Sequence, residues 1–340
     1  MKHFDLVKKV MAAGSMALAA CTFSSSVLAK DAEFTLTYAH SAETKHPWHP
    51  ASLKFVKEVE EKSNGRIKFS SLFTAGEMGS EREMAEAVQQ GTLDVILIAT
   101  MGMSSFDKNL MLFDFPYLFP DFETAYKALD GEPGSLMAQS LEKKGFHVLA
   151  YLENDYRGFS NSKRPIHHPS DLSGLKLRVP ASPVLAEWMK SVNCDPTIMP
   201  YNEVYSAIQT GVVDGQDNGI LLSYTHKIFE VNKYYSLTNH IYCPSPIMIS
   251  SKVWKSMPED LQKILTDAAV DTRDYQRKLN VEYREKYENS AKNDGIQIND
   301  LSADELKEFV ESASKVWPKF ADEIDKNIYD SMMKTIGKAE

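Results

Sequence analysis

Two arginines occupy positions from which side chains at the edge of a sheet would contact an anion. Arg178 is the next-to-last residue of a predicted strand, residues 175–179, and Pro180 ends that strand. Arg157 follows an earlier predicted strand, residues 147–151. Ligands of parallel sheets bind beyond the carboxyl ends of the strands, and a guanidinium binds a carboxylate through two parallel hydrogen bonds, which a lysine does not reproduce. The alternative is that both arginines form ordinary surface salt bridges.

Four further residues offer polar groups near predicted strand ends. Tyr201 opens a predicted helix, and Asn218 lies in a turn-rich run, residues 214–218. His40 and Glu77 fall in loops at the ends of the first two predicted strands. Simple turn chemistry is the alternative explanation for Tyr201 and Asn218, so these four are candidate ligand contacts only through their position.

Signals of catalysis are incomplete. Ser160 and Lys163 have the serine–lysine spacing of penicillin-recognising enzymes, but the Ser-Asp-Asn and Lys-Thr-Gly companions are missing. Ser312 and Lys315 repeat the same spacing on a predicted helix, which shows how easily it arises. No nucleophile elbow, phosphate loop or dinucleotide-binding glycine motif is present. We therefore predict a protein that is not an enzyme and holds no cofactor, with a serine hydrolase as the less favoured alternative.

Two histidine pairs were considered as metal ligands. His46 and His49, like the adjacent His167 and His168, lie beside prolines in predicted loops. Neither pair has a carboxylate at ligand spacing. We interpret them as solvated loop residues and predict no metal site.

The first 29 residues have the pattern of an export signal. Lysines near the start precede a short apolar stretch and small residues up to Ala29, which predicts cleavage after Ala29. The alternative is a lipoprotein anchored at Cys21, because the preceding Leu-Ala-Ala resembles a lipoprotein processing box. Export would place Cys194 and Cys243 in an oxidising compartment, where a disulfide is allowed, although their surroundings favour two separate thiols.

Composition excludes several classes of protein. A length of 340 residues is about twice that of a usual domain, which favours two lobes. The 43% of hydrophobic and 25% of charged residues are typical of a globular protein. A net charge of −9 without a basic cluster argues against nucleic-acid binding, and no apolar run is long enough to span a membrane.

Strands and helices alternate along the chain in two successive series. The strands are predicted at residues 34–40, 67–73, 93–98, 147–151, 175–179 and 197–199. Helices between them are predicted near residues 50–62, 80–90, 184–192, 202–210 and 221–230. This α/β pattern predicts two parallel sheets flanked by helices, with a cleft between them. A final helical stripe from residue 258 runs for about 35 residues, some 50 Å, unless it breaks into two helices near Asp271.

Here the chain resembles the solute-binding proteins of tripartite ATP-independent periplasmic (TRAP) transporters of the dicarboxylate-binding type. The similarity covers nearly the whole mature chain, with motifs in the order of the family. They lie at residues 114–119, 130–131, 161–166, 171–180, 196–199, 203–216 and 238–240.

The resemblance implies a fold and a function. The fold is the two-lobed periplasmic binding protein, with lobe I at residues 30–152 completed by roughly 241–258, lobe II at 153–240, and C-terminal helices at 259–340, one of them long enough to brace both lobes. The protein would close over a small organic anion and deliver it to a sodium-coupled permease with a small and a large membrane subunit. A sensory protein for the same ligands is the alternative.

The resemblance also assigns site residues. The family's main carboxylate-clamping arginine falls on Arg178 and its second arginine on Arg157, although Asp155 replaces a usual glycine. The ligand-contacting asparagine falls on Asn218, with Asp217 before it where glutamate is common.

The kind of ligand is left open by the resemblance. Tyr201 occupies a position that is aromatic in the sialic-acid-binding branch. Residues 98–101 lack the carboxylate that this branch carries, which argues against a large polyhydroxy acid such as sialate. A smaller carboxylate, such as a C4-dicarboxylate or a sugar acid, or a sulfonate such as isethionate, would suit a less polar first lobe.

Overall fold

The computed structural model describes residues 32–338. The predicted export signal, with Ala29 and Cys21, lies outside the described residues. Within them no helix combines the length and the apolar character needed to cross a bilayer. Residues 32–338 are not divided further into separate units. The boundaries predicted for lobe I, lobe II and the C-terminal helices therefore stay a prediction.

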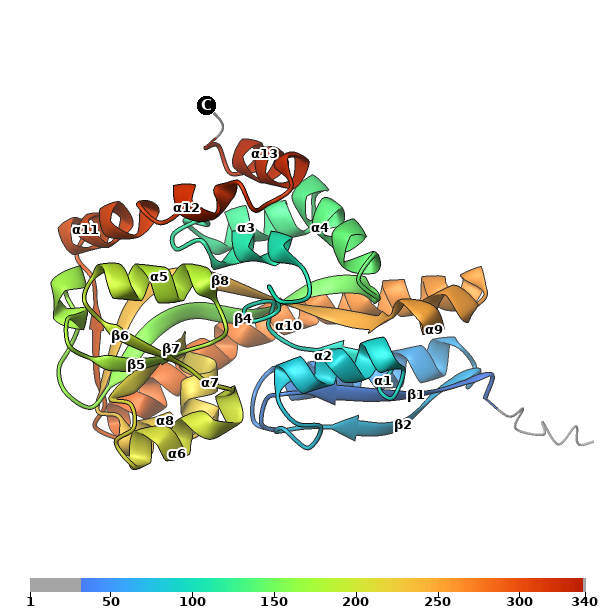
Figure 1. The fold of residues 1–340 in the computed structure, drawn as a ribbon. Helices are drawn as coiled ribbons and strands as arrows, with labels where there is room; N and C mark the ends of the chain where they lie inside the picture. The colour runs from blue at the N-terminus through green and yellow to red at the C-terminus, as the bar shows by residue number, and fades with distance from the viewer. Residues whose placement is uncertain (1–31, 339–340) are drawn as a thin grey trace, which may run out of the picture. The chain divides into compact units, whose positions relative to one another are not determined.

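The described chain builds one mixed sheet with helices on both faces (Figure 1). The strands are β1 Phe34–His40, β2 Ile67–Phe73, β3 Val95–Leu97, β4 Phe146–Asn161, β5 Lys176–Val179, β6 Asp195–Ile198, β7 Gly215–Gly219, β8 Tyr234–Ser250 and β9 Gln297–Asp300. Their order is β2-β1-β3-β8-β4-β7-β5-β6, and β9 pairs with β8. The α/β class predicted from the sequence is confirmed.

The helices lie between and after these strands. They are α1 Trp48–Lys62, α2 Glu81–Gln90, α3 Phe122–Leu129, α4 Glu132–Glu142, α5 Pro183–Ser191, α6 Val204–Gln209, α7 Ile220–Thr225, α8 Ile228–Val231, α9 Ser251–Ser256, α10 Glu259–Asn293, α11 Ala303–Ser314, α12 Pro318–Ala321 and α13 Lys326–Thr335. Short 3-10 helices cover Lys108–Asp114, Pro169–Leu172 and Tyr201–Glu203.

Two long strands join what the sequence predicted as separate parallel sheets. At one end β1 is parallel to β2 and β3, and at the other β5 is parallel to β6 and β7. Between them β4 and β8 run antiparallel to each other and to their outer neighbours. The prediction that all strands pair in parallel is therefore wrong. The predicted strand at 147–151 is only the first part of β4. Strands β7, β8 and β9 were not predicted from the sequence.

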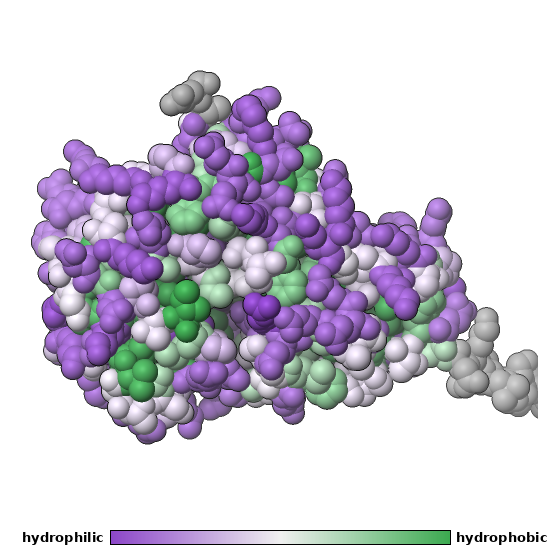
Figure 2. Space-filling model, in the orientation of Figure 1, coloured by the Kyte–Doolittle hydropathy of each residue, from purple (hydrophilic) through white to green (hydrophobic). Residues whose placement is uncertain are grey.

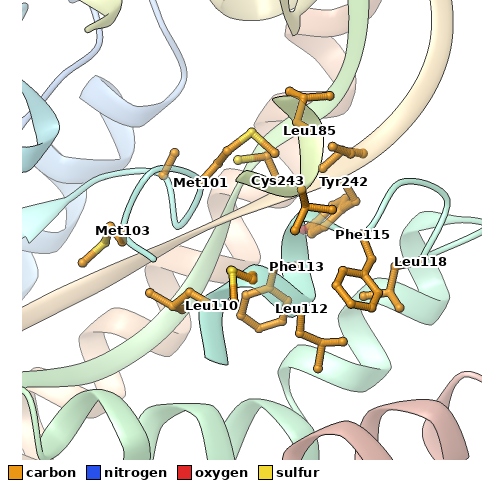
Figure 3. Close-up of a cluster of buried hydrophobic side chains, with 14 of the residues drawn as sticks. Met101, Met103, Leu110, Leu112, Phe113, Phe115, Leu118, Leu185, Tyr242 and Cys243 are labelled. Atoms are coloured by element: carbon orange, nitrogen blue, oxygen red, sulfur yellow. The ribbon is translucent and has the colours of Figure 1, made fainter. Parts of the chain in front are cut away.

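Alternate residues of the strands feed two hydrophobic clusters, one on each face of the sheet. Tyr38 and Leu97 pack with α1 and α10, whereas Ala39 and Ile96 pack with α2, α3 and α4. Figure 3 shows part of the second cluster, where methionines, leucines and phenylalanines surround Cys243. Because both faces are covered, the strand reads as a continuous apolar run at residues 95–98.

The long helix α10 forms as one element. Its 35 residues continue past Asp271 without a break, so the single-helix prediction is confirmed and the broken alternative is wrong. Acidic Glu259 and Asp260 stand in the first turn, where the positive end of the helix dipole favours them. Helix α10 packs on α1, β4 and α7, so it contacts elements from both ends of the sheet (Figure 1).

A buried polar network fixes α10 to β4. Glu153 is fully buried, and its carboxylate accepts hydrogen bonds from Asn280 Nδ2 at 2.8 Å, Arg284 Nη2 at 3.1 Å and the Tyr126 hydroxyl at 2.6 Å. Arg284 Nε also donates to Asp155 Oδ1 at 2.9 Å. Asp155 thus has its own cationic partner on α10.

We predict that Arg284→Ala destabilises the protein by about 3 kcal/mol, because it leaves two buried carboxylates without their cation. Equilibrium unfolding in urea measures the change. The matched control is Lys263→Ala on the same helix, whose exposed pair with Asp267 at 2.8 Å should contribute less than about 1 kcal/mol. Equal effects of the two substitutions would contradict the importance of the network.

Candidate functional site

Arg178 is a buried cation whose outer nitrogens face a cavity. Its side chain, on β5, is 4% exposed, and Nε donates to the Met199 carbonyl at 3.0 Å. Its two terminal nitrogens, Nη1 and Nη2, form no hydrogen bond or ion pair with any other residue among 32–338. Burial lowers the pKa of Arg178 to about 10, and the neighbouring Arg157 adds to the shift. The group stays protonated at neutral pH and has four N–H bonds available to an anion.

Arg157 lies on β4 and is already neutralised by the protein. Its guanidinium is 3% exposed and contacts both Asp217 oxygens, with the shortest distance 2.6 Å from Nη2 to Oδ2. Nη1 donates to Asn218 Oδ1 at 3.2 Å. Burial alone would raise the pKa of Asp217, but Arg157 and His240 together bring it below its usual range. The surface salt-bridge explanation does not hold for either arginine, because both are buried.

Strand pairing brings these side chains together. In the register of the sheet, Arg178 of β5 pairs with Gln216 of β7, and Arg157 of β4 pairs with Gly219 of β7. Asn218 is buried next to Arg157, and the described residues offer no acceptor to its Nδ2. The predicted turn at residues 214–218 is therefore a buried strand, β7, that carries part of the site.

Two adjoining cavities lie between the β1–β3 end of the sheet and its β5–β7 end. The smaller, about 180 Å³, is lined by Arg178, Met101 and Ile198 among others. The larger, about 480 Å³, is of the size that small ligands occupy. Both cavities are also lined by Ser80, Glu81 and Tyr201. They thus form one cleft, which these shared residues divide.

The surface around the cleft is partly apolar. On the face shown in Figure 2, green apolar patches lie over the half of the molecule that holds β5 and β6, within a mostly hydrophilic surface. Ile198, which lines the smaller cavity, is 56% exposed. A ligand that enters there meets both apolar contacts and the guanidinium of Arg178.

Glu81 is a residue of the cleft that the sequence analysis missed. It is the first residue of α2, after the capping Ser80, and its Oε1 accepts from Ser41 Oγ at 2.8 Å and from the Ala99 amide at 3.3 Å. Burial raises its pKa, although these hydrogen bonds and Arg178 oppose the shift. Its sequence context is that of an ordinary acidic first turn, so no sequence signal marked it.

Tyr201 opens a short 3-10 helix and lines both cavities. Its ring stands 5.4 Å from the Arg178 guanidinium carbon and packs edge-on against His226 at 4.7 Å. Its buried hydroxyl has no hydrogen-bond partner in the described part of the chain. Burial raises the pKa of this phenol, so it stays protonated and can donate a hydrogen bond.

His40 and Glu77 are placed less favourably. His40 is buried at the end of β1, where its Nε2 lies 3.2 Å from His49 Nδ1, and it lines neither of the two cavities. Glu77 is exposed, and its carboxylate accepts from the Thr74 amide at 2.6 Å within a local turn. Arg178 and Tyr201 contact each other and line the cleft. Arg157 and Asn218 are hydrogen-bonded to each other but, like His40 and Glu77, line neither cavity.

The remaining sequence patterns do not assemble into sites. Ser160 is buried in β4, whereas Lys163 Nζ lies 3.3 Å from Asp214 Oδ1. The lysine of the serine–lysine pattern therefore pairs with Asp214 and not with the serine. Cys194 and Cys243 are free buried thiols, and burial raises the pKa of each to about 12.

The histidine pairs differ in environment. The prediction that His46 is solvated is wrong, because it is fully buried beside Trp48. His167 and His168 lie at the surface and contact glutamates of α11. Among the described residues no group of three or more histidine, cysteine or carboxylate side chains is arranged to hold a metal ion.

Comparison with known proteins tests the family resemblance independently of the site geometry. The model of the family described as bacterial extracellular solute-binding protein, family 7 (DctP), matches residues 38–323. The 2,3-diketo-L-gulonate-binding periplasmic protein YiaO of Escherichia coli K12 is 33% identical over 276 residues, 81% of this chain and 83% of that protein.

Solved structures agree in fold. The sugar acid binding protein of Advenella mimigardefordensis in complex with galactonate has a TM-score of 0.87 and 26% identity, over 92% of this chain and 100% of that one. A TRAP periplasmic solute-binding protein from Sulfurospirillum deleyianum with bound succinate has a TM-score of 0.82 and 29% identity, over 91% of this chain and 100% of that one. The resemblance stated from the sequence is confirmed.

The buried histidine His40 should make the stability of the protein sensitive to acid. Burial lowers its pKa to about 3, and the nearby His49 adds to the shift. In the unfolded chain it takes up a proton near pH 6.5, so its contribution to stability is lost as pH falls from about 6.5 toward 3. We predict that His40→Gln makes the dependence of unfolding free energy on pH shallower by up to about 1.4 kcal/mol per pH unit.

Urea unfolding at a series of pH values between 7 and 4 measures this slope. The control is His168→Gln: Glu308 raises the pKa of that exposed histidine, so its removal should not make the slope shallower. Parallel curves for the parent protein and His40→Gln would contradict the prediction.

Proposed function

The chain belongs to the family 7 bacterial extracellular solute-binding proteins of TRAP transporters, and we propose that it captures a small organic acid outside the cytoplasm for uptake. The observation that carries the proposal is Arg178: a buried guanidinium whose terminal nitrogens have no protein partner among the described residues and which lines a cavity. An unpaired buried cation is costly. An anion that supplies the missing charge is therefore bound strongly.

We propose that Arg178 holds the carboxylate of the ligand, with Arg157 and Asn218 beside it. Charge-assisted hydrogen bonds to both terminal nitrogens contribute about 1.5–3 kcal/mol each. Asp217 compensates most of the charge of Arg157. This supports a role for Arg157 in positioning Asn218, and Arg157 itself offers at most one further N–H to the ligand. Tyr201 supplies a hydroxyl and an aromatic wall.

Capture by closure follows from where these residues lie. The cleft is lined by elements from both ends of the sheet, so a ligand that contacts both favours the closed arrangement by its differential affinity. The proposed partners are the small and large membrane subunits of a sodium-coupled permease. Export with cleavage after Ala29, or a lipid anchor at Cys21, belongs to the same proposal. A sulfonate would satisfy Arg178 as a carboxylate does.

We expect Arg178→Ala to weaken binding of a cognate acid by about a hundredfold or more, because two charge-assisted hydrogen bonds are lost. Arg178→Lys should recover little, since an ammonium cannot form the two parallel bonds of a guanidinium. Isothermal titration calorimetry measures both. Lys176→Ala, an exposed position on the same strand, is the control and should bind normally. Near-normal affinity in Arg178→Lys would refute the clamp.

The ligand itself is identified by mass spectrometry of small molecules released from the purified protein. A thermal-shift screen of carboxylates and sulfonates supports it, because a ligand at a hundred times its Kd stabilises the native state by about 2.7 kcal/mol. Absence of any bound or stabilising acid would argue against the proposal. Turnover of a bound ester would favour the hydrolase alternative instead.

A further inference from the structure

We propose that Glu81 restricts the site to acids with one carboxylate and several hydroxyl groups, and disfavours dicarboxylates. This inference rests on the proposed function, since it concerns the class of acid that the same cleft takes. It is carried by the charges that face the cleft and by the free oxygen of Glu81.

Of the two buried arginines near the cleft, one is left without an ion-pair partner among the described residues. Arg157 and Asp217 form a buried ion pair at 2.6 Å, so together they present little net charge. Arg178 is the cation that remains, and it can bind one carboxylate. Glu81 lines the same small cavity and carries a carboxyl group.

Several contacts favour the ionised form of Glu81. Its Oε1 accepts hydrogen bonds from Ser41 Oγ and the Ala99 amide, which are donors and thus stabilise an anion. It opens the ten-residue helix α2, whose amino end carries partial positive charge. Burial, the largest effect, raises the pKa of Glu81, and both arginines oppose that shift by favouring its charged form electrostatically.

The second oxygen of Glu81 is left for the ligand. Within residues 32–338 no hydrogen bond to Oε2 is recorded, while Glu81 lines both cavities. An ionised carboxylate is an acceptor only. It therefore accepts hydrogen bonds from hydroxyl groups of a ligand, whereas a second ligand carboxylate would place two like charges in a partly desolvated space, which is unfavourable.

Cations at the rim do not remove this restriction. Lys45, Arg82 and Lys227 line the cavities near solvent. Arg82 pairs with Glu86 at 2.9 Å, and Lys227 lies 3.9 Å from a carboxylate oxygen of Glu230. Lys45 is exposed. Exposed charges are screened by water and contribute little, so they cannot replace a buried partner for a second carboxylate.

Calorimetry with two four-carbon acids tests the inference. D-Erythronate has one carboxylate and three hydroxyl groups, and succinate has two carboxylates and none. We expect the parent protein to bind D-erythronate at least tenfold more tightly than succinate. Glu81→Gln should weaken D-erythronate and strengthen succinate, so that the ratio of the two affinities falls at least tenfold. Glu123→Gln, which removes an exposed first-turn acid of α3 that lines neither cavity, is the matched control and should leave the ratio unchanged.

The outcomes separate this inference from the proposed function. Binding of succinate as tight as that of D-erythronate, or an unchanged ratio in Glu81→Gln, would overturn the role of Glu81 while the capture of organic acids stands. An unchanged ratio would also mean that Glu81 is protonated, because glutamine mimics the neutral acid. If the parent protein binds neither of these acids nor any other small organic acid, the proposed function itself fails.

Discussion

A buried guanidinium that forms no ion pair with any described residue is the feature on which the rest of the site depends. Arg178 loses hydration on burial, and its Nε–H bond to Met199 compensates for only part of that loss. Arg157, on a nearby strand of the same sheet, differs because the Asp217 carboxylate neutralises its charge. His240 Nε2 in turn lies 2.7 Å from Asp217 Oδ1. Only the first arrangement leaves a strong requirement for an external anion.

The rigidity of this arrangement comes from backbone packing around β7. A side chain on Gly215 would place its Cβ 1.9 Å from the Ser160 carbonyl oxygen, and one on Gly219 would place it 2.7 Å from Asp155 Cβ. These two glycines therefore let β4 approach β7 closely enough for Arg157 to contact Asp217. The same strand β4 is anchored on its other side by the network of Glu153 and α10, so the position of the site is fixed from two directions.

What the sequence predicted and what it missed have physical reasons. Helix α10 was predictable because its apolar stripe repeats over many turns, and Arg178 because it ends a clearly alternating strand. Strand β7 was not, since Gly-Gln-Asp-Asn-Gly has turn composition and is a strand only through its packing. Strand β8 contains Pro244 and Pro246, which argue against a central strand, yet it pairs with β4 at both. Glu81 gave no signal because helix capping alone explains an acid there.

The proposed selectivity and the proposed closure are two consequences of one interaction. The ladder between β4 and β8 is irregular at three places, near residues 148–150, 153–155 and 157–159, and such irregularities are where a sheet bends. In the proposed closure, bending there changes the separation between α2, which carries Glu81, and β5, which carries Arg178. A ligand with an anionic end and a row of neutral hydroxyl donors satisfies both groups at once. A ligand with two anionic ends satisfies Arg178 but is repelled by Glu81, so it gains less from the closed arrangement and favours it less.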